Sequence, residues 1–351
     1  MTNTYTAIDL SKLPMPQFVA PLDYDSIYNE SLAYLLSLDP TFNAIVESDP
    51  AIKVIRALAY RELILRQDIN DQAKQCMLAY ATGAHLDVAA GNLLIARLDG
   101  EDDEAFRERT ASAPEGYSVA GPTGAYRFHA MSAHPNIRDV DIWNPKIGGR
   151  VNVSVLSKDG DGSTSGARIT HPEGYLDGAT LIAVTDVLAD LQTGMKLTFE
   201  NGAVFTLDAD FPSGSTALTG VLEGTLVEGE RAGILPFVMD ALSAEDVRPL
   251  CDTVRVMSAA IVNYEIIAEL TLYYGPDAMV VLQNALENLS AYKESIRRCG
   301  HDITRSGIFA ALHQPGVQNV HIISPAEDIV INDGEAGFCT DVNVTVPRRD
   351  V

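Results

Sequence analysis

The sequence predicts an α+β protein of several domains, with an N-terminal helical arm, a duplicated framework of mixed sheet backed by helices, and a small inserted β domain. Three observations support this fold class: apolar residues recur at helical spacing over roughly the first 112 residues, one motif occurs twice, and a run rich in Gly and Thr lies between its copies. At 351 residues and 46% hydrophobic composition, the chain can bury more than one core. The expected divisions are residues 1–120, 121–162 with 230–260, 163–229, and 261–351.

The N-terminal arm, residues 1–120, is predicted to be a bundle-forming helical domain. Apolar residues within 24–36 fall at helical spacing. The longest helix is expected from about Pro50, a favourable first-turn residue, to Thr82, with Gly83 as its stop. This helix carries a seam with a spacing of about 3.5 residues, formed by Ile55, Leu58, Leu65, Ile69 and Cys76. The seam fits either an ordinary core helix or a helix that bundles with other subunits.

A turn-rich stretch, residues 114–122, is predicted to be the hinge between the arm and the framework. The charged segment before it, residues 101–109, has acids in its first turn and an arginine at its end. That pattern fits a helix stabilised by its dipole better than it fits acid–base chemistry. Pro122 is also expected to open the following helix. The predicted hinge residues are Pro114, Gly116, Gly121 and Pro122.

The motif that occurs twice indicates an internal repeat. Residues 134–145 (HPNIRDVDIWNP) match residues 314–325 (QPGVQNVHIISP) with a constant offset of 180 residues. Each copy follows an apolar helical run and precedes, after a loop, an alternating strand at 151–155 or 342–346. The repeated unit is therefore helix, turn, strand, loop, strand. Convergence of common helix–turn–strand units remains the alternative to duplication.

The stretch that interrupts the first repeat unit, residues 163–229, is predicted to be an inserted acidic β module. It contains short strands around Asn201-Gly202, a dipeptide that strongly favours a hairpin when apolar residues alternate on both sides. Nine acids lie in this stretch against only two basic residues. An acidic β domain inserted into a loop of the framework is the simplest interpretation.

Residues 261–351 are predicted to form the second α+β unit. Alternating strands are expected at 253–257 and 261–274, followed by a helix that starts at Pro276 and reaches Ile296. The order strand, long helix, short helix, strand, strand favours helices packed on a mostly antiparallel or mixed sheet.

Composition and motifs argue against catalysis, metal binding and nucleic-acid binding. The formal net charge of −23 disfavours a phosphate-binding surface. The sequence has no P-loop, Rossmann fingerprint or nucleophile elbow, and its four cysteines are isolated. We therefore expect no catalytic, cofactor-binding or metal-binding residue, and a protein that is not an enzyme. A hydrolase with a dispersed active site and a carbohydrate-binding adhesin remain the alternatives.

No apolar run in the sequence approaches the length that a bilayer requires, about 20 residues. The N-terminus also lacks a basic region followed by an apolar run, so no secretory signal is expected. These observations predict a soluble product of the cytoplasm.

Five short motifs follow one another in a specific order and spacing. They are ELILRQDINDQAKQCMLAYATGAHLD (62–87), EDDEAFRER (101–109), SVAGP (118–122), DVRPL (246–250) and the Gly316-Val317 strand entry. Together they resemble the baseplate J-like family, whose members are baseplate wedge subunits of contractile-tailed bacteriophages and related contractile injection systems. The resemblance covers most of residues 20–162 and 230–346. Shorter family members lack the 163–229 module, which leaves its role open.

The resemblance implies a structural role in the tail baseplate of a virion, assembled in the host cytoplasm. Wedges of this family form a ring around the tail hub, hold fibres and transmit the trigger for sheath contraction. Implied partners are a second copy of the chain in the wedge, a smaller tail or wedge protein, neighbouring wedges, and hub or sheath-initiating proteins, with tail fibres as further candidates. The resemblance implies no cofactor, no nucleic acid and no membrane.

The resemblance also assigns two surfaces. It implies that the helix carrying the seam of residues 55–76 bundles with partner proteins. It also implies that the C-terminal unit is the dimerisation and ring-contact domain. The implied subunit-contact residues are Ile308, Val317, Val320, Ile322, Val342 and Val344.

Overall fold

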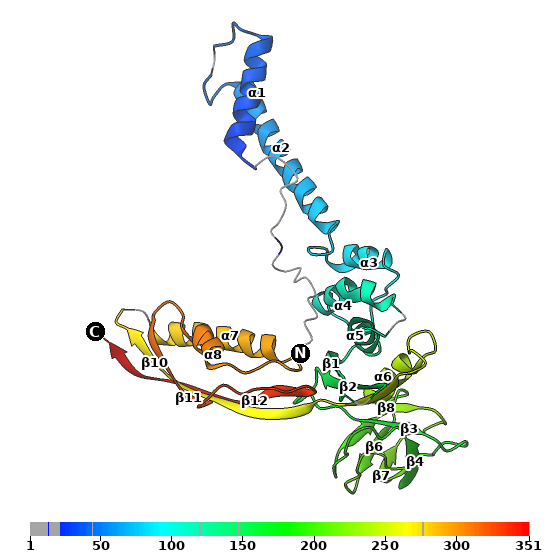
Figure 1. Cartoon of the computed structure of the whole chain (residues 1–351). Helices are drawn as coiled ribbons and strands as arrows, with labels where there is room; N and C mark the ends of the chain where they lie inside the picture. Colours follow the sequence, from blue (N-terminus) through cyan, green and yellow to red (C-terminus); the bar gives the residue numbers. More distant parts are fainter. Residues whose placement is uncertain are drawn as a thin grey trace. The chain divides into compact units, whose positions relative to one another are not determined.

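The computed structural model describes residues 13, 22–43, 45–118, 121–146, 148–275 and 277–350. The chain divides into two compact units, one ending at Pro114 and one beginning at Glu115. Helices and several mixed sheets confirm the predicted α+β class (Figure 1).

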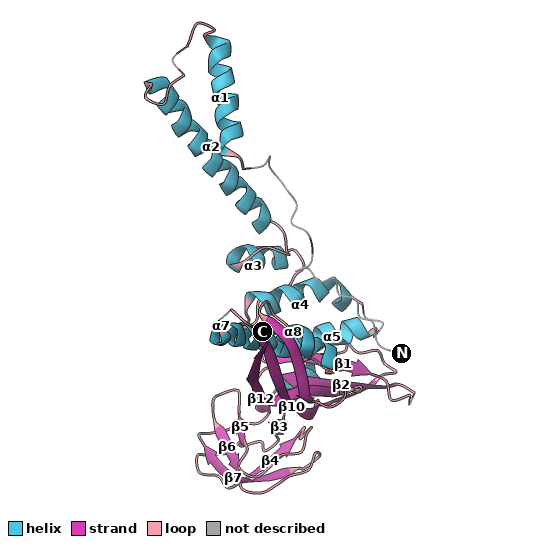
Figure 2. Ribbon diagram, turned by 90° about the vertical axis from the view of Figure 1, so that its left-hand side faces the viewer, coloured by secondary structure: helices cyan, strands magenta, loops and turns pink. Residues whose placement is uncertain are grey.

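The first unit is built from helices. They are α1 (Tyr24–Leu38), α2 (Pro50–Gln75), α3 (Gly83–Gly91) and most of α4 (Asp103–Gly116). Asp23 caps α1 by accepting backbone N–H groups of its first turn, and Asp49 caps α2 in the same way. α1 and α2 lie side by side (Figures 1 and 2) and share a small buried core, Ile27, Ile52, Ile55 and Ala59.

α2 ends at Gln75, earlier than the predicted end at Thr82. The side-chain oxygen of Gln75 accepts the N–H of Thr82 at 2.9 Å, and the chain turns between the two. This turn buries Ala81 in a cluster with Leu86 and Phe106. Burial in that cluster overrides the local helical pattern.

α4 is fixed by two arginines. Arg109 donates to both carboxylate oxygens of Glu101, at 2.7 and 2.6 Å, and both side chains are buried. Arg107 donates to the carbonyl oxygens of Leu78 and Ala81, at 3.0 and 2.7 Å, which ties α4 to the turn after α2. The charged segment is thus a structural helix, as its dipole pattern predicted.

The second unit begins with a three-stranded sheet of order β1-β2-β9. Its elements are α5 (Thr123–Met131), β1 (Ile137–Trp143), β2 (Arg150–Ser157), α6 (Leu235–Ser243) and β9 (Thr253–Ser258). β2 is central, antiparallel to β1 and parallel to β9. Helices α5 and α6 pack with the sheet in one core, which includes Tyr126, Val153, Leu235, Val238 and Val256.

A second three-stranded sheet has the order β11-β10-β12. Its elements are β10 (Ala260–Tyr273), α7 (Ala278–Ile296), α8 (Arg305–Leu312), β11 (Val317–Ser324) and β12 (Glu335–Asp350). β10 is antiparallel to β11 and parallel to β12, while α7 and α8 lie over one face (Figure 1). The predicted start of the long helix, Pro276, lies outside the described residues, and Asp277 caps that helix.

The two copies of the repeated motif occupy matching places in the two sheets. β1 and β11 are each an edge strand antiparallel to the central strand, and β9 and β12 are each the edge strand parallel to it. The central strands differ in origin, because β2 follows β1 in sequence whereas β10 precedes β11. In the first copy of the repeated unit, β1 and β2 pair directly. In the second copy, β10 lies between the corresponding strands, β11 and β12.

The residues between β2 and α6 form a six-stranded barrel. Its strands are β3 (Gly166–Ile169), β4 (Leu181–Thr185), β5 (Lys196–Thr198), β6 (Val204–Leu207), β7 (Ala217–Glu223) and β8 (Arg231–Gly233). The order is β5-β6-β7-β4-β3-β8, and a bridge between Phe199 and Ala232 joins the two ends. The hairpin predicted at Asn201-Gly202 is confirmed as the β5–β6 connection.

Two arginines fasten the barrel to α6. Arg168 and Arg231 each contact a carboxylate oxygen of Asp240, at 2.5 and 2.9 Å. The Arg231 guanidinium also lies 4.0 Å from the centre of the Phe237 ring. Since Arg168 and Arg231 come from the paired strands β3 and β8, the entry and exit of the barrel share one attachment.

Candidate assembly surfaces

An exposed apolar stripe runs along α2. Of the predicted seam, Leu58, Leu65 and Ile69 are 61%, 53% and 55% exposed, and Cys76 is exposed where the helix ends. Ile55, by contrast, is buried beside α1. Three of the predicted seam residues are thus large apolar side chains left open to solvent by the described chain.

Val54 completes the stripe in place of Ile55. Each helical residue advances about 100°, so positions 54, 58, 65, 69 and 76 share an arc of about 60°. Val54 is exposed, whereas Ile55 lies on the side that faces Ile52 and Ala59. The predicted seam omits Val54 because it begins one position later, at Ile55. Val54 lies four residues before Leu58, and that spacing is the signal that would have identified it.

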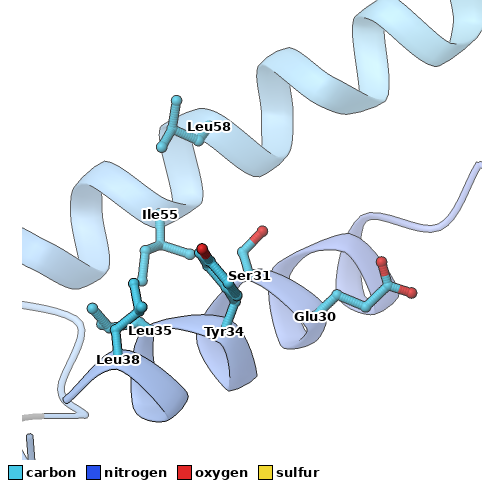
Figure 3. A pocket seen from close by; sticks show the side chains of 7 residues that line it. All are labelled: Glu30, Ser31, Tyr34, Leu35, Leu38, Ile55 and Leu58. Carbon is cyan, nitrogen blue, oxygen red and sulfur yellow. The ribbon is translucent and has the colours of Figure 1, made fainter.

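The upper part of the stripe opens into a groove between α1 and α2 (Figure 3). The groove has a volume of about 430 Å³. Glu30 is the one acidic or basic side chain among its lining residues, which are Glu30, Ser31, Tyr34, Leu35, Leu38, Ile55 and Leu58. Tyr34 and Leu38 are each 67% exposed, and neither was predicted from sequence. The groove therefore extends the apolar surface from α2 onto α1.

Charged side chains lie beside this apolar surface. Arg56 pairs with Glu47 at 2.8 Å and lies 5.7 Å from the Tyr28 ring centre. The hydrogen bond from Arg56 lowers the pKa of the Glu47 carboxyl below its usual value. Within α2, Arg66 pairs with Glu62 and Lys74 with Asp71. α2 therefore carries charged side chains on both sides of its apolar stripe.

The predicted hinge residues fall at the junction of α4 and α5. Pro114 and Gly116 lie within α4, so the helix continues further than the predicted turn allowed. Pro114 has no N–H to donate to the carbonyl oxygen four residues earlier, and it lies in the last turn of α4. Gly121 has a φ of +73°, and a Cβ there would lie 2.7 Å from Pro249. Pro122 precedes α5, as predicted, whereas residues 119 and 120 are outside the described part. Motion at this junction stays a prediction.

The predicted subunit-contact residues pack into the chain's own core. Ile308 of α8 and Val317, Val320 and Ile322 of β11 are buried in one cluster, and Val342 and Val344 pack partly buried against it. Their side chains hold the second sheet together. A subunit contact through this region would therefore use other groups, and it stays a prediction.

The free side of β12 offers such groups. β12 pairs with β10 on one side and is the last strand of its sheet, and the other side is bridged to Cys299 at Ala336, so the free edge within the described residues lies beyond Ala336. Along this strand Asp341, Asn343 and Thr345 are exposed, on the face opposite the partly buried valines. An edge strand presents unpaired backbone N–H and C=O groups to another chain.

Polar contacts join the two sheets where β9 runs into β10. Ala259, the single residue between these strands, donates its N–H to Val155 of the first sheet. Asp139 accepts the N–H of Cys299 at 2.9 Å, and Asp141 accepts the N–H of Gly334 at 2.7 Å. We refer to these contacts as the joint. Burial raises the pKa of the Asp141 carboxyl above its usual value, and nearby Asp333 and Asp139 raise it further.

Three further observations concern metal binding, membrane spans and sugar binding. Among the described residues, no group of His, Cys, Asp or Glu could hold a metal ion, and no helix is long and apolar enough to cross a membrane. The aromatic rings of the barrel, which an adhesin would stack on sugars, pack in or against its core, namely Tyr175, Phe199, Phe205 and Phe211.

Comparisons with known proteins match both ends of the chain and its whole length. The family described as "Baseplate J-like N-terminal domain" matches residues 47–99, and "Baseplate J-like protein C-terminal domain" matches residues 264–345. Baseplate protein J of Escherichia phage P2 is 34% identical over 365 aligned positions, covering 98% of this chain and 99% of that protein. The N-terminal match contains α2 with its apolar stripe. The barrel lies outside both domain matches but within the full-length one.

Proposed function

The chain belongs to the baseplate J-like family, and on that premise we propose that it builds a phage baseplate by bundling its N-terminal arm with partner proteins. Membership of this family implies a structural role in a phage baseplate and a location in the virion tail. It also implies that the chain associates with other baseplate components. The proposal adds the surface through which that association occurs.

The exposed stripe on α2 is the observation that carries the proposal. Fully burying a Leu, Ile or Val side chain stabilises a complex by about 1.5 to 3 kcal/mol relative to leaving it in water. Val54, Leu58, Leu65 and Ile69 offer four such side chains on one helical face. A partner helix along this face and in the α1–α2 groove would bury them by the packing used in helix bundles.

At the other end of the chain, we propose a contact with a second copy through the free edge of β12. Backbone pairing at a sheet edge needs no exposed apolar side chain. It therefore suits a region in which Val317, Val342 and Val344 already serve the chain's own core. Identical chains joined by two different surfaces can build a closed ring.

The finer role that these surfaces support is that of a wedge subunit. In this proposal each wedge contains two copies of the chain and a smaller tail protein, and the wedges surround the tail hub. The ring holds fibres and transmits the trigger for sheath contraction. Neighbouring wedges and hub or sheath-initiating proteins are the further partners, and assembly occurs in the host cytoplasm.

Labelling of intact phage particles tests the proposed location. We expect gold-labelled antibodies raised against the barrel, residues 166–233, to bind the distal end of the tail in electron micrographs. Antibodies that have been pre-absorbed with the purified chain should not label the same particles. Labelling of the head, or particles that lack the chain altogether, would contradict a baseplate role.

A further inference from the structure

The barrel has a filled interior, so any binding that it performs must use its outer surface. Large side chains from all around the barrel meet inside it, and Phe205 and Leu218 are fully buried there. Closed barrels of few strands are filled by their own side chains in this way. Closure through Phe199 and Ala232 also leaves no free strand edge between β5 and β8 for another chain to pair with.

The outer face of β4, β7 and β6 is unusual because its centre carries no charge. In a sheet with one buried face, the outward positions are ordinarily polar or charged. Here the cross-strand pairs that point outward are Ala183 with Ala217, Leu181 with Thr219, Thr206 with Val221, and Val204 with Glu223. Leu181 and Val221 are 55% and 53% exposed. These three strands lie side by side in Figure 2. We call this surface the β4–β7–β6 face.

The border of the β4–β7–β6 face is acidic. Asp208 lies at this border, where its carboxylate accepts a hydrogen bond from the hydroxyl of Thr219. Glu223 closes one end of the face, and Asp177, which accepts the N–H of Gly224 at 2.8 Å, lies next to it. Lys196, paired with Thr206, is the one basic residue among the strand residues of β4 to β7. Three carboxylates therefore surround an apolar centre, with one ammonium group opposing them.

We infer that the β4–β7–β6 face docks a different tail protein, one whose contact surface has an apolar centre and a basic border. This inference rests on the proposed place of the chain in the tail. An apolar, β-branched sheet face is stabilised by removal from water, and its acidic border attracts lysines and arginines. A second copy of this chain fits less well, because Asp177, Asp208 and Glu223 of both copies would be brought together.

Site-specific cross-linking in intact tails tests the inference. A benzophenone amino acid is placed at Val221, in the middle of the face, or at Val330, a valine outside the barrel that is more exposed, at 66% against 53%. After irradiation of purified tails, we expect position 221 to be joined to another tail protein, at a peptide that carries Lys or Arg. Position 330 should give no such product. Cross-linking of position 221 to a second copy of this chain, or to nothing, would overturn the inference.

Charge reversal tests the acidic border separately. Replacing Asp208 and Glu223 by Lys in the chain that carries the cross-linker should lower the yield from position 221 at least about tenfold, because like charges would then meet across the contact. An unchanged yield would overturn the basic partner. The same mass spectra show whether the chain is in the tail. Its absence there would contradict the proposed function, whereas its presence without a cross-link contradicts only this inference.

Discussion

A buried ion pair and a partly buried carboxylate show how single residues hold this chain together in different ways. Arg109 and Glu101 form a double hydrogen bond in the first unit, and Arg109 also donates to the carbonyl oxygen of Ala96 at 2.7 Å. Asp141 in the joint has the backbone N–H of Gly334 as a donor but lies near two other carboxyl groups. The Glu101 carboxylate is therefore neutralised by Arg109, whereas the Asp141 carboxyl is partly desolvated next to other acidic groups, which disfavours its charged form.

Replacing Arg109 by Met should destabilise the first unit. The change leaves Glu101 buried without its charged partner, which costs about 3 to 5 kcal/mol. Urea unfolding followed by hydrogen exchange of the α4 amides measures the loss. The matched control is Arg56→Met, which breaks the exposed pair with Glu47 and should leave the stability nearly unchanged. Equal effects of the two substitutions would show that the Arg109 pair is not a stabilising contact.

Asp141 should make the joint less stable as the pH rises. Its pKa is raised in the folded chain, so the folded state binds the proton more tightly than the unfolded state does. The contribution to stability is therefore fully present below the ordinary value of 3.8 and is lost as the pH rises through the raised value. Asp141→Asn keeps an oxygen that can accept the Gly334 N–H, and it should flatten this slope and stabilise the chain at pH 7. Thermal unfolding midpoints between pH 4 and 7 provide the measurement. Parallel pH profiles for both proteins would contradict the assignment.

For single elements, the sequence predicted where helices and strands occur, but not which face of a helix is buried or which strands become neighbours. The helical pattern of α2 was evident, but periodicity does not distinguish Ile55, which faces α1, from Val54, which faces solvent. The strands of both repeat copies were also evident. Sequence could not show that β10 would separate β11 from β12, because strand order depends on contacts between distant segments.

The inserted module shows the same contrast. Its strands and its Asn201-Gly202 hairpin were predictable from local signals. Closure into a barrel was not, because the Phe199–Ala232 bridge joins distant residues. The structure also shifts the predicted limits of the module, 163–229, toward the C-terminus, since β3 begins at Gly166 and pairs with β8, which ends at Gly233.

Excising residues 166–233 should leave the rest of the chain folded. Ile234 donates its N–H to the carbonyl oxygen of Ser165 at 3.1 Å, so two glycines can join the cut ends. Circular dichroism and hydrogen exchange of α5, α6 and β2 provide the measurement. The comparison variant removes 163–229, the limits predicted from sequence, and leaves β8 without β3. We expect it to be the less stable of the two. Unfolding of β2 and α6 in the first variant would show that the barrel is part of the framework's folding unit.

At the scale of the whole molecule, the chain places its candidate contacts on three separate parts. The arm presents an apolar stripe, the second sheet presents the edge of β12, and the barrel presents the β4–β7–β6 face. Sequence predicted Leu58, Leu65 and Ile69 of the stripe, because helical spacing makes a stripe visible, but it included the buried Ile55 and omitted Val54. It placed the subunit contact in the segment that contains β12, but on side chains that prove to be core. The third depends on which strands become neighbours, so it could not be seen before the fold.

The amount of this chain in purified tails, measured by quantitative mass spectrometry, tests the central claim most directly. The variant that replaces Leu65 and Ile69 by Asp carries two charges on the stripe, and Tyr60→Asp places one on the opposite side of the same helix. We expect the double variant to fall at least about tenfold in tails, since it forfeits at least about 1.4 kcal/mol of apolar contact. Tyr60→Asp should be incorporated like the natural chain. Full incorporation of the double variant, or equal loss of both, would contradict assembly through the arm.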